Sequence, residues 1–94
     1  MRISKEEIEL LRKILSEMDS EAKIYLFGSR VYDEKKGGDI DLLIVSKILT
    51  RKELKKIKRE FFNKFGEQKI DILLDDGEFK NPFIEKIRKE AVEL

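Results

Sequence analysis

Residues 23–46, KIYLFGSRVYDEKKGGDIDLLIVS, constrain the fold more than any other stretch, because they hold two short apolar runs separated by a polar segment. The first run, Ile24 to Phe27, stops at Gly28, and the second, Ile40 to Val45, is entered through a glycine pair and Asp39. Short apolar runs rich in β-branched residues and bounded by glycine or aspartate are typical of strands. The stretch therefore predicts two strands joined by a loop.

Two carboxylates, Asp39 and Asp41, stand at the start of the second predicted strand. Side chains alternate along an extended chain, so both carboxylates point to one face of the sheet, while Ile40 and Leu42 point to the other. Carboxylates that converge on one spot repel each other, and the repulsion raises their pKa values unless a cation lies between them. Because oxygen ligands favour hard ions, the pair predicts a magnesium site.

Three helices and a third strand are predicted in the rest of the chain. Capping-box pairs and apolar residues at helical spacing predict helices from Lys5 to about Asp19 and from Arg51 to Phe65. The run Lys69 to Leu74, KIDILL, predicts a third strand. Asn81 and Pro82 provide an N-cap and a first-turn proline for a last helix. Its side chains expected to face inward are Phe83, Ile84, Ile87 and Ala91.

These elements predict an α/β or α+β fold in the order helix, strand, strand, helix, strand, helix. The simplest arrangement is a small mixed sheet with helices packed on one face. The sequence of 94 residues has no linker, internal repeat or low-complexity stretch. A chain of this size is expected to form a single domain, residues 1–94, with one site.

A third carboxylate, Asp71, lies between Ile70 and Ile72 in the third predicted strand. A lone buried carboxylate is costly, so its position needs an explanation. In one interpretation this strand lies beside the second strand and directs Asp71 to the site of Asp39 and Asp41. In the other, Asp71 lies on the solvent-facing side of an edge strand. The presence of the first two carboxylates favours the shared site.

The tripeptide Gly28, Ser29 and Arg30 also has two interpretations. As a turn that ends a strand, it needs only the conformational freedom of glycine and a local hydrogen bond from serine. As a phosphate-binding turn, it lets the backbone approach a phosphate at Gly28, offers the Ser29 hydroxyl as a donor, and adds the charge of Arg30. A short helix after the turn would add its N-terminal dipole.

Composition excludes several kinds of chemistry. The chain has no cysteine and no histidine, which excludes a thiolate nucleophile, a disulfide and the usual zinc ligands. The formal charge of +1 favours neither a general nucleic-acid binder nor an acidic tail. No apolar run approaches the roughly 20 residues of a membrane span, and the N-terminus lacks the apolar core of a signal peptide. A cytoplasmic protein with no membrane contact is therefore expected.

The combined pattern resembles that of a known superfamily. An apolar-Gly-Ser turn, nine intervening residues, Asp-apolar-Asp on a strand and an Asp on a later strand resemble the signature of the DNA polymerase β-like nucleotidyltransferases. The chain looks most like the minimal nucleotidyltransferases, which are encoded beside HEPN-domain toxins, and the likeness extends from the N-terminal helix to the closing NPFIEKIRKEAVEL. Two differences are Gly38, where relatives often carry serine, and the short charged loop VYDEKKGG.

The resemblance implies a role for each site residue in a fold like the polymerase β palm. Gly28 and Ser29 would bind the nucleotide phosphates, and Arg30 follows them as in many members of this group. Asp39 and Asp41 would ligate two Mg²⁺ ions, or Mn²⁺. Asp71 would complete the metal site and help to activate the attacking hydroxyl.

The resemblance also implies a reaction and a partner. The chain would transfer AMP from ATP to a tyrosine of a cognate HEPN ribonuclease toxin and so act as an antitoxin. The alternative is a non-catalytic antitoxin or binding module that neutralises its partner by complex formation alone. Retention of Ser29, Asp39, Asp41 and Asp71 favours the enzyme. Residues 51–64 hold seven basic and two acidic residues, which fits an RNA, an acidic partner or a solvated helix face, so direct nucleic-acid binding stays open.

Overall fold

The computed structural model describes residues 1–32 and 38–94. Residues 33–37, which hold most of the charged loop expected after the first strand, lie outside the described residues. Within the described ranges the helices are α1 (Lys5–Met18), η1 (Gly28–Val31, a 3-10 helix), α2 (Arg51–Phe65) and α3 (Pro82–Arg88). The strands are β1 (Lys23–Phe27), β2 (Ile40–Val45), β3 (Ile70–Asp75) and β4 (Val92–Glu93).

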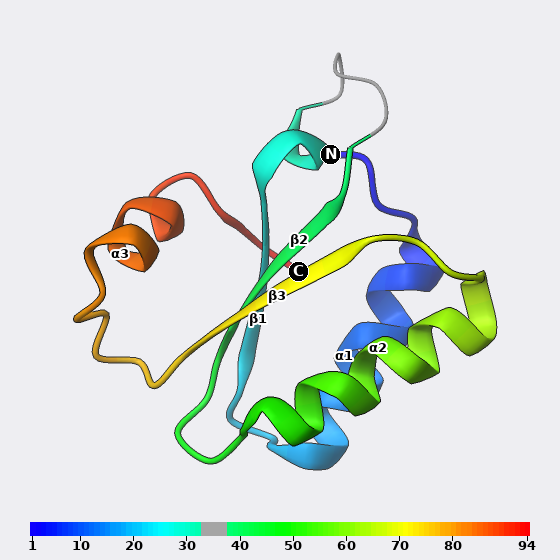
Figure 1. The fold of residues 1–94 in the computed structure, drawn as a ribbon, viewed down its shortest axis with the longest axis horizontal. Coiled ribbons are helices and arrows are strands. Elements are labelled where there is room, and N and C mark those ends of the chain that lie inside the picture. Colours follow the sequence, from blue (N-terminus) through cyan, green and yellow to red (C-terminus); the bar gives the residue numbers. More distant parts are fainter. Residues whose placement is uncertain (33–37) are drawn as a thin grey trace.

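The strands form one mixed sheet in the order β3-β2-β1-β4 (Figure 1). Strand β1 is antiparallel to both β2 and β4, whereas β2 and β3 run parallel and are connected through α2. The predicted α+β fold and the predicted order of helices and strands are confirmed. The structure adds β4, which the sequence pattern did not predict.

One face of the sheet holds the main hydrophobic core. Strand residues at even positions point to this face and pack against α1 and α2, which lie side by side (Figure 1). The buried members of this core from the sheet are Ile24, Leu26, Ile40, Leu42, Ile44 and Ile70. The helices contribute Leu11, Ile14, Leu15, Leu54, Ile57 and Phe61. Because side chains alternate along a strand, the odd-numbered strand residues, including Asp41 and Asp71, point to the opposite face.

The opposite face is partly covered by α3, which lies across the sheet from α1 and α2 (Figure 1). Leu43 points to this face and has no exposed surface, and Ile84 of α3 is 6% exposed. The prediction that helices pack on one face thus holds for α1 and α2, while α3 occupies the other. Since α3 has only seven residues, it leaves part of this face open.

Helix starts follow the capping signals in the sequence. Ser4 with Glu7 and Thr50 with Glu53 form complete capping boxes at the starts of α1 and α2, and the Asn81 side chain accepts a hydrogen bond from the Phe83 N–H. The predicted bounds of α2 are confirmed, and α1 ends one residue earlier than predicted. None of the helices within the described residues has the length and hydropathy to span a membrane.

The last helix was predicted less well. Phe83 is 62% exposed, and Ala91 lies beyond the end of α3, so the prediction that both face inward from this helix is wrong. After Arg88 the chain leaves the helix and pairs with β1 through β4. The Leu94 N–H donates to the Ile24 carbonyl at 3.0 Å. Residues 92–94 therefore pair with the sheet, with Leu94 packed against the core and Val92 37% exposed.

Candidate active site

Parallel pairing of β2 and β3 brings two of the predicted carboxylates together. Asp41 lies opposite Asp71 in the register of the two strands, so both side chains point to the same face of the sheet. Asp39 precedes β2 by one position and sits at the same end of the sheet. The expected position of Asp71 beside Asp41 is thus observed, on the face away from α1 and α2. The shared metal site of all three carboxylates stays a prediction.

The three carboxylates differ in their surroundings. Asp71 is exposed on the edge strand, as its second interpretation required, while Asp41 on the central strand is partly buried. Partial burial raises the pKa of Asp41, and the charges of Asp71 and Asp39 raise it further, against an opposing effect of Lys69. The Lys69 Nζ lies 3.4 Å from Asp39 Oδ2. The site therefore concentrates negative charge, which Lys69 partly offsets.

The Gly-Ser turn lies against this carboxylate group. Phe27, the last residue of β1, pairs with Asp41, so the chain turns away at Gly28 directly beside that side chain. Gly28 has a φ of +79°, and a Cβ there would overlap Asp41 Oδ2. Gly38 has a φ of +87°, and a Cβ there would overlap the Ser29 hydroxyl oxygen. Glycine at both positions is what allows the turn, the serine and the carboxylate to meet.

Arg30 is held by backbone groups in this structure. Its guanidinium donates to the Gly38 carbonyl at 3.3 Å and to the Arg2 carbonyl at 3.0 Å. These hydrogen bonds connect the turn to Gly38, shortly before β2, and to Arg2, before α1. The prediction that Arg30 binds a phosphate stays a prediction, and its observed contacts give it a role in shaping the turn.

Arg2 is a functional candidate that sequence reasoning missed. Its N–H donates to the Arg30 carbonyl at 2.7 Å. Its side chain donates to the Ser29 carbonyl at 3.2 Å and to the Tyr32 carbonyl at 3.1 Å. Three hydrogen bonds from one residue thus hold η1 in place. No motif marks Arg2, because its partners are main-chain atoms some thirty residues away.

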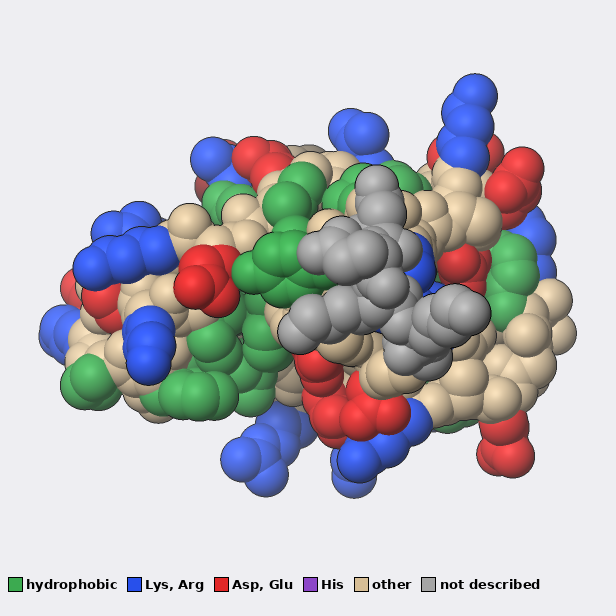
Figure 2. Space-filling model, turned by 90° about the horizontal axis from the view of Figure 1, so that it is seen from above, with side chains coloured by type: hydrophobic (Ala, Val, Ile, Leu, Met, Phe, Trp, Pro, Cys, Tyr) green, Lys and Arg blue, Asp and Glu red, His purple; other side chains and the backbone are tan. Residues whose placement is uncertain are grey.

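A small pocket adjoins the turn. It measures about 280 Å³ and is lined by Gly28, Ser29, Val31, Tyr32 and Glu90. Glu90 comes from the segment between α3 and β4, so the pocket lies between η1 and the end of the chain. Tyr32 is 42% exposed. Figure 2 views the same end of the molecule and shows both acidic and basic side chains, with neither sign covering the face.

The donor chemistry of the carboxylates fits a hard divalent ion. Their mutual repulsion raises the pKa of Asp41, and a cation between them would relieve it. Among the described residues, however, no three acidic side chains are already gathered closely enough to hold a metal ion. The expected ligand set is Asp39, Asp41 and Asp71. These ligand roles, and the phosphate contacts of Gly28 and Ser29, stay predictions.

Comparison with protein families agrees with the geometry. A family model described as "Nucleotidyltransferase domain" matches residues 8–94. The matched range includes the turn at Gly28 and all three carboxylates. A search of curated proteins found no match.

Proposed function

This chain belongs to the nucleotidyltransferase domain family, and on that basis we propose that it transfers AMP from ATP to a hydroxyl group, with divalent metal ions as cofactors. The observation that supports the proposal most directly is the pairing of Asp41 with Asp71, beside which the Gly28 turn closes. This arrangement places candidate metal ligands next to a candidate phosphate-binding turn. Such a neighbourhood is what nucleotidyl transfer requires.

The proposed reaction is a single displacement at the α-phosphorus of ATP. The acceptor oxygen forms a bond to that phosphorus, and the bond from phosphorus to the bridging oxygen breaks to release pyrophosphate. Magnesium ions, or manganese, held by Asp39 and Asp41 would supply charge neutralisation and lower the pKa of the acceptor hydroxyl. The exposed Asp71 is assigned the hydroxyl proton, because it can pass that proton on to water. The Ser29 hydroxyl would donate to a phosphate oxygen.

The proposed acceptor is a tyrosine of a HEPN ribonuclease toxin, whose modification would neutralise the toxin. This part of the proposal is supported by the resemblance of the motif to minimal nucleotidyltransferases. The pocket beside Ser29 and Tyr32 is open enough to admit part of a nucleotide. A partner would then approach from the exposed side of Asp71.

A transfer assay tests the reaction. The protein is incubated with a candidate HEPN protein, ATP and Mg²⁺, and the HEPN protein is then weighed by mass spectrometry and assayed for toxicity. Wild type is expected to add the mass of one adenylyl group. Asp41→Asn should reduce transfer by at least about 10²-fold, since it removes a charge that acts at the reacting phosphate. Glu67→Gln, which changes an exposed acidic residue outside the site, should leave transfer unchanged.

The outcomes separate the enzyme from the alternative. Loss of both added mass and neutralisation in Asp41→Asn supports transfer as the function. If the variant neutralises its partner fully and wild type adds no mass, the protein is a binding module and the enzyme proposal is wrong.

Metal dependence has its own measurement. We expect ATP binding, followed by calorimetry, to weaken markedly when EDTA removes divalent ions, because the carboxylates would then repel the phosphates. Addition of excess Mg²⁺ should restore it. Equal affinity for ATP with and without divalent ions would contradict the cofactor assignment.

A further inference from the structure

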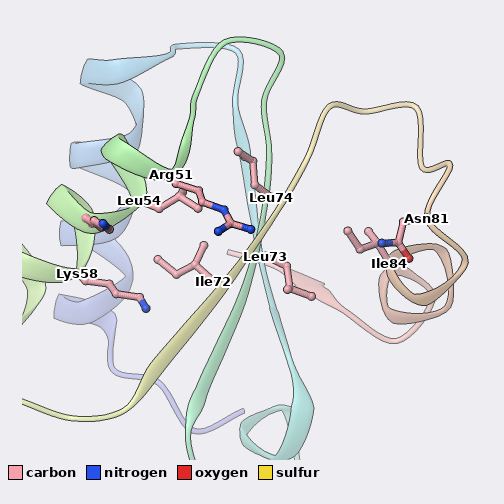
Figure 3. A pocket seen from close by; sticks show the side chains of 9 residues that line it. Arg51, Leu54, Lys58, Ile72, Leu73, Leu74, Asn81 and Ile84 are labelled. Atoms are coloured by element: carbon pink, nitrogen blue, oxygen red, sulfur yellow. The ribbon is translucent and has the colours of Figure 1, made fainter.

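The outer edge of β3 carries a groove that the proposed chemistry does not use. The groove has a volume of about 510 Å³ and lies between α2 and α3 (Figure 3). On the α2 side it is lined by Arg51, Lys55 and Lys58, and on the α3 side by Ile84. Its floor is formed by β3 itself, residues 72–74.

This groove runs along the edge of the sheet rather than over one face. Ile72, Leu73 and Leu74 all line it, although consecutive strand residues point to opposite faces. Figure 3 shows Leu73 on the α3 side of the strand and Ile72 on the α2 side. A single cavity can touch all three only where it meets the strand from its open edge. All three side chains are partly exposed.

The main chain at this edge is available for pairing. The Ile40 N–H donates to the Lys69 carbonyl at 3.0 Å, and the Ser46 N–H donates to the Asp75 carbonyl at 2.9 Å. In a parallel pair each residue directs its N–H and C=O to the same side, so odd-numbered residues of β3 bond to β2. Residues 70, 72 and 74 therefore direct their backbone N–H and C=O groups away from β2, toward the open edge of the sheet. No strand within the described residues pairs with this edge.

The two sides of the groove differ in chemistry. Arg51, Lys55 and Lys58 give the α2 side positive charge, and no acidic residue among those described lines the groove. Leu73 and Ile84 make the α3 side mainly apolar, with Asn81 as a polar, uncharged neighbour. A strand added at this edge would point its side chains alternately to the two sides. The best match is a segment in which acidic and apolar residues alternate.

We propose that the β3 edge binds an extended segment of a partner protein, with alternating acidic and apolar residues, by strand addition. Pairing of β3 with the same strand of a second copy is disfavoured, because it would bring the two sets of basic residues together. Since β3 begins next to Asp71, a segment docked there would lead toward the candidate active site. The inference does not depend on transfer of AMP, and binding alone tests it.

The test uses the full chain labelled with ¹⁵N and a synthetic peptide of about eight residues in which Glu and Val alternate, slightly longer than a typical strand. We expect saturable amide shifts at Ile70, Ile72 and Leu74, which weaken as salt concentration rises. A peptide of the same composition with its Glu and Val residues in separate blocks should bind less tightly, and one with Lys in place of Glu should not bind.

Charge reversal on α2 provides a matched pair of variants. Lys55→Glu should weaken peptide binding about three- to tenfold, because it replaces attraction with repulsion at the groove. Lys56→Glu changes the neighbouring exposed lysine, which does not line the groove, and should change binding less than about twofold. Lys58→Glu provides a second groove variant if Lys55→Glu does not fold.

Three results would overturn the proposal. The first is no saturable shift with the alternating peptide up to millimolar concentration. The second is an equal loss of binding in Lys55→Glu and Lys56→Glu, which would indicate a response to net charge. The third is binding of single-stranded oligouridine at Arg51, Lys55 and Lys58 without binding of the peptide, which would make the groove a nucleic-acid surface.

Discussion

Asp41 is the residue on which the candidate site depends most, because it lies between the third carboxylate and the Gly28 turn. It lies opposite Asp71 on one side and beside the Gly28 turn on the other. Its raised pKa shows that the folded protein holds this charge at a cost when no ion is bound. A carboxylate that opposes folding but is suited to hold a cation is typical of a functional site.

Removal of this charge should stabilise the metal-free protein. Because the folded state raises the pKa of Asp41 above its ordinary value of 3.8, the stability linked to its proton is complete below that value and is lost as pH rises through the folded pKa. At pH 7 the ionised group therefore lowers stability. We expect Asp41→Asn to raise the Tm in EDTA at pH 7, by differential scanning fluorimetry.

The pH dependence supplies the control for this prediction. The difference in Tm between Asp41→Asn and wild type should shrink as pH falls toward 3.8, where wild type is protonated as well. Added Mg²⁺ should raise the Tm of wild type more than that of the variant. A variant less stable than wild type at pH 7 would show that Asp41 supports the fold.

At this scale the positions of the candidate site residues were largely predictable. The alternation of side chains along a strand predicts that Asp39 and Asp41 point to one face of the sheet. The end of the first apolar run predicts a turn at Gly28 and Ser29. The side-chain contacts of Arg30 were not predictable, because they depend on where the Gly38 and Arg2 carbonyls lie in the folded chain. A motif fixes which residue types are present, but not which of several acceptors a long side chain selects.

Among the secondary-structure elements, η1 depends strongly on hydrogen bonds from another part of the chain. It has only four residues and no buried side chain. Val31 packs against the core only in part, so the hydrogen bonds from Arg2 add to a limited packing contact. The segment before α1 thus helps to hold the candidate phosphate-binding turn in position.

Loss of the Arg2 side chain should weaken the attachment of η1 to the N-terminal segment. Arg2→Ala removes two side-chain hydrogen bonds, each worth about 0.5 to 1.5 kcal/mol, but keeps the bond from its N–H. We expect a rise in the KM for ATP of roughly three- to tenfold with a small drop in Tm. Steady-state kinetics and fluorimetry measure the two effects.

Two further variants separate geometry from charge. Arg2→Lys should recover little, because an ammonium group cannot reproduce the fork of a guanidinium. Arg59→Ala, at an exposed position on α2, should leave the KM unchanged. An unchanged KM in Arg2→Ala would show that Arg2 does not position the candidate phosphate-binding turn.

The elements themselves were predicted where the sequence carries a repeated signal. Capping boxes and apolar spacing gave α1 and α2 nearly to the residue. Strand β4 was missed because two residues carry no periodicity, and its existence depends on the free edge of β1. The same limit explains Phe83, whose helix is too short for spacing to distinguish the covered side from the exposed one.

At the scale of the whole molecule, stability comes mainly from the face shared by the sheet, α1 and α2. Phe61 of α2 is fully buried in that core, whereas Phe83 of α3 is 62% exposed on the other side. The two phenylalanines therefore form a matched pair that differs in surroundings. Substitution of each one shows how much its face of the sheet contributes to the stability of the protein.

We expect Phe61→Ala to lower the free energy of unfolding by about 3 to 5 kcal/mol, because it leaves a cavity in a packed core. Phe83→Ala should change it by less than about 0.5 kcal/mol. Urea unfolding followed by circular dichroism gives both values. Similar losses in the two variants would show that α3 contributes to the core as strongly as α2.

The parallel pairing of β2 with β3 also has a consequence for how the chain acquires its site. Asp71 lies thirty positions after its partner Asp41, and all of α2 must be formed between them. Non-local contacts of this kind are slow, because the entropy of closing a long loop opposes them. A chain emerging from the ribosome therefore carries the Gly28 turn and two carboxylates well before the third. The candidate site is therefore complete only after β3 has emerged and paired with β2.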